Sequence, residues 1–115
     1  MLAHGALLRK NFFSAEQLAA IVKDFRKAGL SPEEVALMSF AQKITTQARQ
    51  ISEAEIDELH GYGLTDEEIL EVVLACAARN FFSKTLDTLN ARPDEIYLEL
   101  EPELLQVLSL GRPFP

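Results

Sequence analysis

The side chains best suited to thiol or acid–base chemistry in this sequence are one cysteine, Cys76, and two histidines, His4 and His60. A thiol becomes a nucleophile when it loses its proton, and an imidazole can transfer protons near neutral pH. One cysteine cannot form a disulfide within its own chain, so no disulfide framework is expected. Neither histidine stands in a His-x-x-x-His or Glu-x-x-His pattern, so we expect no zinc or di-iron site and no metal cofactor.

The surroundings of Cys76 favour a structural role over a redox role. It lies in the apolar run 72–78, where a free cysteine behaves as a small hydrophobic side chain. No Lys or Arg precedes it within one turn to lower its pKa, and Arg79 follows it. A redox thiol remains the alternative. His60 stands at the end of a predicted helix, where a cation is favoured, and we interpret it as structural or solvated.

The segment from Gly63 to Asn90 is predicted to form one long helix. Thr65 is a good N-cap, and Glu68 three residues later would complete a capping box. The middle of the segment, residues 72–78, presents apolar side chains all the way round. A helix without a polar face is buried on every side, so we expect other helices to surround this one.

The rest of the chain repeats the same pattern of helix starts and stops, so the predicted fold class is all-α. Capping residues and helical spacing predict helices over 2–12, 14–28, 31–46, 52–61 and 101–110. Only a few residues around Ile96-Tyr97-Leu98 alternate as a strand would. Two similar stretches 34 residues apart, at Gly29 and Gly63, could indicate a tetratricopeptide repeat, but two helical hairpins with the same capping chemistry explain them more simply.

Length and charge exclude several classes of function. A chain of 115 residues with 48% hydrophobic residues is expected to form one domain over 1–115. A net charge of −7 argues against binding nucleic acid or an anionic membrane. No signal peptide opens the sequence, and no apolar segment approaches the roughly 20 residues of a membrane span. We therefore expect a cytoplasmic protein.

Four stretches in a fixed order resemble a known family. They are Phe-Ala-Gln-Lys-Ile from Phe40, Ser-Glu-Ala-Glu-Ile from Ser52, Gly-Leu-Thr-Asp-Glu-Glu-Ile-Leu from Gly63, and Asn-Phe-Phe-Ser-Lys from Asn80. The pattern resembles the carboxymuconolactone decarboxylase family, and within it the alkylhydroperoxidase D-like, peroxidase-related branch. The resemblance runs from about His4 to Asp94. It implies an alkylhydroperoxidase D-like helical bundle.

In that branch the active site is a Glu on one helix and Cys-x-x-Cys-x-x-x-His-Gly at the start of the next. The stretch from His4 resembles the part that begins at this histidine, which implies a proton-relay role for His4. Residues 1–12 would then be the remnant of the active-site helix in a bundle truncated at the N-terminus, with residues 94–115 outside the family pattern. The thiol pair is absent from the sequence. It could have been lost in a divergent member, it could lie on the missing part of a split or truncated protein, or Cys76 could serve a different chemistry.

The resemblance implies antioxidant defence, with a small peroxide as substrate; the lactone decarboxylase activity of the wider family is less favoured, because no site for a carboxylate substrate is evident. The alternative is a non-catalytic helical protein that binds a small molecule or a protein partner. In either case we expect a homo-oligomer, a dimer, trimer or hexamer. Its interface would include the apolar N-terminal segment, the long helix or the C-terminal tail.

Overall fold

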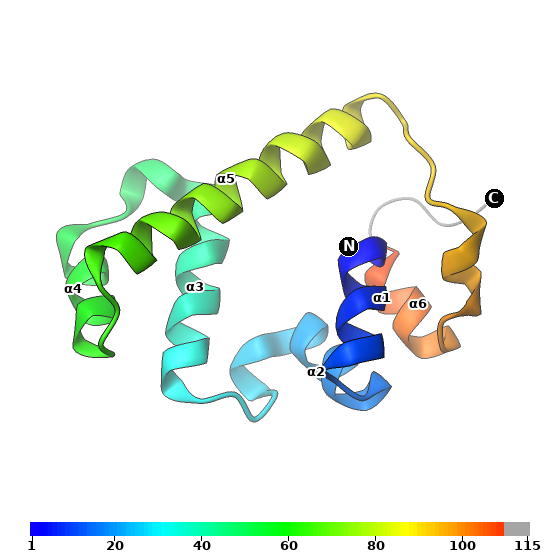
Figure 1. Cartoon of the computed structure of the whole chain (residues 1–115), viewed down its shortest axis with the longest axis horizontal. Helices are drawn as coiled ribbons and strands as arrows, with labels where there is room; N and C mark the ends of the chain where they lie inside the picture. The colour runs from blue at the N-terminus through cyan, green and yellow to red at the C-terminus, as the bar shows by residue number, and fades with distance from the viewer. Residues whose placement is uncertain (110–115) are drawn as a thin grey trace. The chain divides into compact units, whose positions relative to one another are not determined.

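The computed structural model describes residues 1–109, except for the side chain of Leu2, and these residues contain helices and turns but no strand (Figure 1). The all-α prediction is confirmed for this part of the chain. The α-helices are α1 (Leu2–Asn11), α2 (Ala15–Asp24), α3 (Pro32–Gln47), α4 (Glu53–Gly61), α5 (Asp66–Thr88) and α6 (Pro102–Leu108). The 3₁₀ helices are η1 (Phe25–Lys27), η2 (Ala48–Gln50) and η3 (Glu95–Glu99), and η3 includes the three residues that alternate as a strand would.

The helix starts follow the predicted capping chemistry. Ser14, Ser31 and Ser52 each form a capping box with the Gln or Glu three residues later. At α5 only half of the predicted box is present. The Thr65 hydroxyl accepts a hydrogen bond from the backbone N–H of Glu68 at 3.2 Å. The second bond of the box, from the backbone N–H of Thr65 to the Glu68 carboxylate, is not found among the described contacts. The carboxylate still lies in the first turn, where the helix dipole favours negative charge.

The ends of two helical segments use left-handed residues. Gly29 follows α2 and η1 with φ +77°, and Gly63 follows α4 with φ +94°. Asn90 ends α5 with φ +57°, and the N–H of Ala91 donates to the carbonyl oxygen of Leu86 at 3.0 Å. Glycine and asparagine adopt this conformation most readily, so these residues fix where each helix stops.

The chain divides into two compact units. Unit 1 consists of residues 1–30 together with the chain from Arg92 onward, and unit 2 consists of residues 31–91. Each unit has a hydrophobic core of its own. The expectation of one domain over 1–115 stays a prediction.

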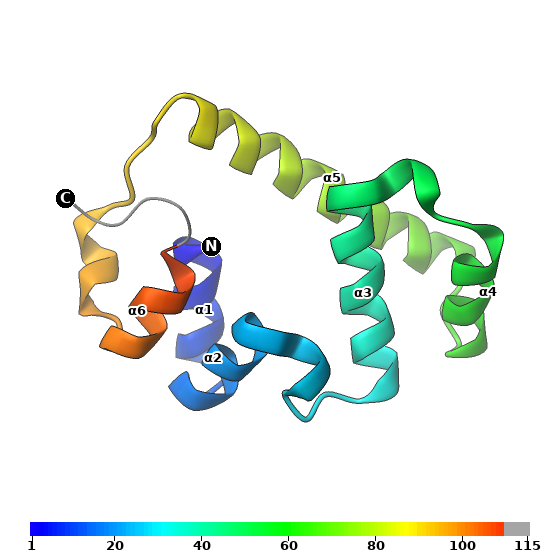
Figure 2. The same ribbon diagram turned by 180° about the vertical axis from the view of Figure 1, so that it is seen from behind.

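The core of unit 1 joins α2 to α6. Leu18 and Ala19 of α2 are buried together with Leu104 and Leu108 of α6, and Leu104 is completely inaccessible to solvent. In both ribbon views α1 lies beside α6 (Figures 1 and 2). A Cβ atom on Gly5 of α1 would stand 2.5 Å from a methyl carbon of Leu108, so glycine allows the close approach of these two helices. The C-terminal segment, which the family resemblance leaves out, therefore supplies half of this core.

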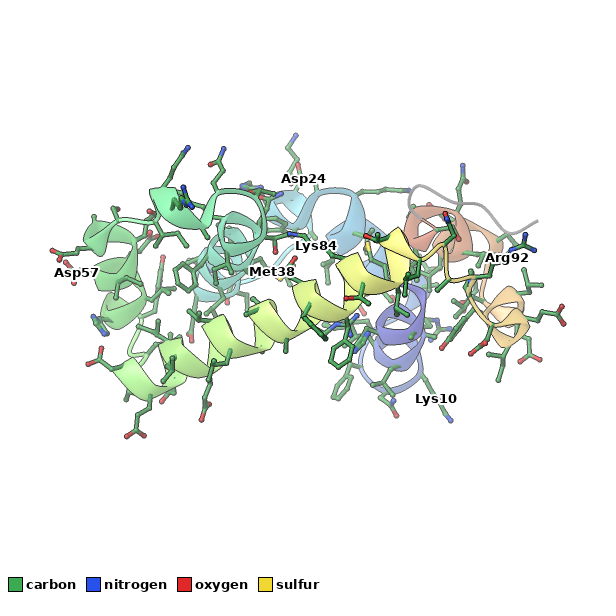
Figure 3. The ribbon with its side chains drawn as sticks, turned by 90° about the horizontal axis from the view of Figure 1, so that it is seen from above. Lys10, Asp24, Met38, Asp57, Lys84 and Arg92 are labelled. Atoms are coloured by element: carbon green, nitrogen blue, oxygen red, sulfur yellow. The ribbon has the colours of Figure 1, made fainter. Side chains whose placement is uncertain are left out.

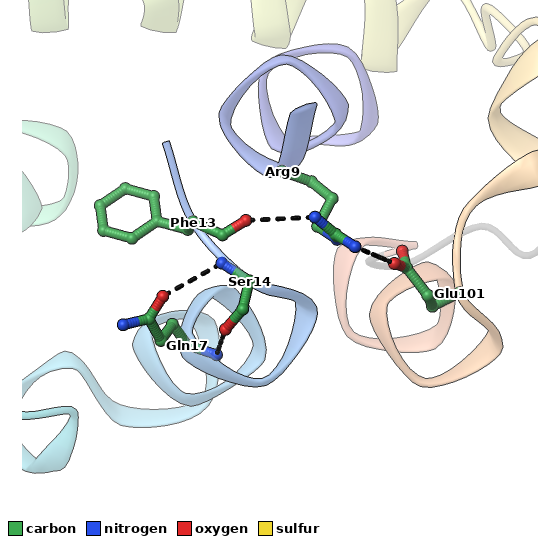
Figure 4. Close-up of polar contacts among 5 residues, drawn as sticks. All are labelled: Arg9, Phe13, Ser14, Gln17 and Glu101. Atoms are coloured by element: carbon green, nitrogen blue, oxygen red, sulfur yellow. Dashed lines mark hydrogen bonds and ion pairs between the residues drawn. The ribbon is translucent and has the colours of Figure 1, made fainter. Parts of the chain in front are cut away.

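Two ion pairs connect α6 to the rest of unit 1. Arg9 Nη2 lies 2.6 Å from Glu101 Oε1, and its Nε donates to the same oxygen at 2.8 Å (Figure 4). Lys23 Nζ lies 2.7 Å from Glu103 Oε1. The bond from Arg9 lowers the pKa of Glu101, and the bond from Lys23 lowers the pKa of Glu103. Because the folded-state pKa values are lowered, both pairs stabilise the fold above the ordinary pKa of a glutamate, and this contribution is lost as the pH falls through the lowered values.

The core of unit 2 is formed by α3, α4 and α5. Phe40, Leu59, Leu64 and Ile69 are buried together. The sequence pattern also predicts Met38 on the buried side of α3, and this is wrong, since its side chain is 39% exposed. Lys43 Nζ lies 2.7 Å from Glu55 Oε1 and lowers the pKa of that carboxyl group, which ties α3 to α4.

The long helix α5 crosses α3 and packs against α4 along only part of its surface (Figures 1 and 2). Of its 23 residues only Ile69 is buried. Within residues 1–109, α3 and α4 cover one side of α5, so the expectation that other helices surround it is met only on that side. Cover for the rest of residues 72–78, which are apolar all round, stays a prediction.

Candidate functional site

One side of α5 faces the core of unit 2 and holds Cys76. Ile69, Val72, Val73, Cys76 and Asn80 follow one another at steps of one to four residues and form the buried or half-buried side of the helix, here called the inner stripe. The Asn80 side-chain amide donates to Thr45 Oγ1 of α3 at 3.0 Å and to the Cys76 carbonyl oxygen at 2.9 Å. The Asn80 side chain therefore connects α5 to α3.

The Cys76 thiol is a free, half-buried group among apolar neighbours. Burial raises its pKa above the ordinary value of a cysteine. A raised pKa keeps the thiol protonated at neutral pH, and the protonated form is a poor nucleophile. The interpretation of Cys76 as a packing residue is thus favoured over a redox role by the burial of the thiol.

We expect Cys76 to react slowly with iodoacetamide at pH 7, several-fold more slowly than the thiol of free glutathione. Because burial raises the pKa, the rate should continue to increase with pH beyond the point where glutathione reaches its plateau. Mass spectrometry of samples quenched between pH 6 and about pH 10.5 measures both rates. A rate at pH 7 above that of glutathione would contradict this assignment and would indicate an activated thiol.

His4, the residue to which the family resemblance assigns a proton relay, lies on α1 in unit 1 and is exposed. Cys76 belongs to unit 2. The two candidate residues therefore belong to different compact units, and a shared catalytic site for them stays a prediction. The neighbour of His4 in the sequence, Gly5, is buried against Leu108, which gives a packing reason for the glycine of this pair.

His60 connects α4 to α5. Its Nε2 lies 2.7 Å from Asp66 Oδ1 at the start of α5, and its Nδ1 lies 3.9 Å from Asp57 Oδ1 on α4. An imidazole at the C-terminus of one helix and a carboxylate at the N-terminus of the next each lie where the helix dipole favours their charge. The structural interpretation of His60 is supported, although sequence reasoning missed its partner Asp66 six residues later.

A second side of α5, about 100° round the helix from the inner stripe, is apolar and exposed. We call it the outer stripe and define it as Leu70, Leu74, Ala77 and Phe81. The leucines are 55% and 58% exposed and the phenylalanine 68%. Spacings of four, three and four residues place these side chains on one face of a helix. Exposed apolar side chains in such a row mark an interaction surface more strongly than isolated ones do.

Other kinds of site receive no support from the described residues. Residues 1–109 contain no group of three or more His, Cys, Asp or Glu side chains placed to hold a metal ion. A shallow, open depression near the end of α5 is lined by Lys84, Thr85, Thr88 and Leu89, which include neither a thiol nor a carboxylate. Over the same part of the chain, no helix has both the length and the apolar character needed to cross a membrane.

Comparison of this chain with protein-family models, with curated proteins and with solved structures gives no match. The resemblance to the carboxymuconolactone decarboxylase family therefore rests on the four sequence stretches alone.

Proposed function

We propose that this chain is a helical subunit of a homo-oligomer with an alkylhydroperoxidase D-like scaffold. Its function in this proposal is to assemble through α5 and to bind a partner or small molecule, and its own thiol does not reduce peroxide. The observation that carries the proposal is the outer stripe of α5, an exposed row of apolar side chains, three of them large, on the longest helix of the described residues.

The chemistry of the thiol supports the non-catalytic part of the proposal. A thiol peroxidase of the kind implied by the family resemblance needs one thiolate to attack the peroxide and a second thiol to resolve the oxidised product. The 115 residues contain one cysteine, and burial raises its pKa. Neither requirement is met within these residues.

A peroxide-consumption assay with a dithiol donor tests the absence of turnover. We expect wild-type protein and the Cys76→Ser variant to consume peroxide at the same rate, equal to that of the donor alone. Turnover by the wild-type protein that disappears in the Cys76→Ser variant would contradict the proposal.

Light scattering tests the assembly part. At low micromolar concentration the mass should be well above the 12.8 kDa of one chain. A mass of one chain over the whole accessible concentration range would refute the proposed oligomer.

A second candidate function, antioxidant peroxide reduction with thiols from outside these residues, is supported by the resemblance of His4-Gly5 to the His-Gly pair of the family's active site. His4 lies on α1 and is exposed. The test is the same peroxide assay on a longer chain that includes any in-frame codons upstream of Met1. Turnover in the longer chain that is lost on His4→Ala would support this candidate.

A further inference from the structure

The pattern of charges along α5 indicates how two copies of the chain would meet. Asp66, Glu67, Glu68 and Glu71 all lie in the first six residues of the helix, and its basic residues, Arg79 and Lys84, lie in the second half. The N-terminal part of the helix is therefore acidic, and its basic residues lie in the C-terminal half. Two such helices attract each other when they run in opposite directions and repel each other when they run in the same direction.

The outer stripe has a matching symmetry. Leu70 and Phe81 lie at equal distances along the sequence on either side of the peptide bond between Ala75 and Cys76. Leu74 and Ala77 also lie symmetrically about this bond, closer to it. Glu67 and Lys84 also lie at equal distances from that bond, one turn beyond each end of the stripe, and both are exposed. In Figure 3, Lys84 is labelled on the C-terminal half of the helix.

We propose that the outer stripes of two copies of this chain pack against each other in antiparallel orientation, with the two-fold axis between the two helices, at the level of the Ala75–Cys76 peptide bond. Leu70 of one copy then contacts Phe81 of the other, and Leu74 contacts Ala77. Glu67 and Lys84 form an ion pair at each end. The small side chain of Ala77 near the axis allows the two helices to approach closely, and the long leucine opposite it fills the space.

The inner stripe and the charges near it are compatible with this arrangement. Asp87, the acidic residue of the second half of α5, is eighteen residues from Ile69, which is five full turns, and so lies on the inner side of the helix. It is also three residues from Lys84 and exposed, so the basic charge at this end of the outer stripe is that of Lys84 beside a carboxylate. The opposed dipoles of two antiparallel helices add a small attraction. This inference rests on the proposed homo-oligomer and specifies its contact.

Disulfide cross-linking distinguishes the two orientations. Two variants are made in the Cys76→Ser background, one with Leu70→Cys and one with Phe81→Cys. Each variant is oxidised by itself with diamide. A mixture of the two, unfolded and refolded together, is oxidised in the same way. Antiparallel pairing places these positions opposite each other, so covalent dimers should form in the mixture, with one chain of each variant, and hardly at all in either variant alone. Covalent dimers of Leu70→Cys alone would show parallel pairing and overturn the proposal.

A charge swap provides a second, independent measurement. Glu67→Lys and Lys84→Glu should each weaken the dimer by about 3- to 10-fold, because each creates two like-charge pairs, and the double variant should restore the wild-type dissociation constant. Sedimentation velocity at low salt measures all four proteins. If the double variant is weaker than both single variants, Glu67 and Lys84 are not partners and the proposed register is wrong.

The two proposals fail in different ways. If wild-type protein is oligomeric in light scattering but the mixed cysteine variants do not cross-link, the antiparallel contact is wrong and the homo-oligomer stands. If the wild-type protein is a monomer, both are wrong.

Discussion

Replacing Leu74 with glutamate should convert the oligomer into single chains. Leu74 is 58% exposed in the isolated chain, so the substitution leaves the core of unit 2 intact. In the proposed dimer it removes two buried leucines, one from each copy, at roughly 1.5 kcal/mol each. The resulting loss of about 3 kcal/mol corresponds to a rise in the dissociation constant of about 100-fold or more. Sedimentation velocity over a concentration series measures this change, and far-UV circular dichroism should show unchanged helix content.

The matched control is Leu86→Glu. Leu86 lies on the same helix and is similarly exposed, at 51%, but it is outside the outer stripe. The same change of side chain there should alter the dissociation constant much less. Equal dissociation of both variants would contradict the assignment of the contact to the outer stripe.

The second large effect concerns folding. Leu104→Ala should destabilise unit 1 by about 3 kcal/mol, because it removes a completely buried side chain and leaves a cavity between α2 and α6. Hydrogen exchange measured by mass spectrometry should show faster exchange in peptides from α2 and α6. Peptides from α3 and α4 report on unit 2 and should respond less, since unit 2 has its own core.

Leu98→Ala is the control for this prediction. Leu98 belongs to unit 1 and is half exposed, so the same substitution should change stability by less than about 0.5 kcal/mol. If Leu104→Ala were as mild as Leu98→Ala, α6 would not be an essential part of the core of unit 1.

The local features of the fold could be predicted from the sequence. The capping boxes at Ser14, Ser31 and Ser52 need only residues three positions apart, and all three are present. The left-handed residues Gly29 and Gly63 stop helical segments for the same local reason. Such signals are short-range hydrogen bonds and backbone preferences, which a sequence shows directly.

The long-range features could not be predicted in the same way. Periodicity shows that a helix has an apolar side but not which partner covers it, so the sequence pattern wrongly predicts that Met38 is buried, and it does not show which helices cover α5. The ion pair between Arg9 and Glu101 joins residues 92 positions apart, and no sequence pattern predicts it. The candidate site suffers from the same limit, since His4 and Cys76 belong to different compact units.

The central claim is that a second copy of the chain covers the outer stripe of α5, and carbene footprinting of the wild-type protein tests this most directly. As the concentration is raised from well below to well above the dissociation constant, labelling of Leu74 and Phe81 should fall several-fold, while labelling of Leu86 changes little. If Leu74 and Phe81 are labelled equally at every concentration, including those at which light scattering reports an oligomer, the outer stripe is not the contact between copies.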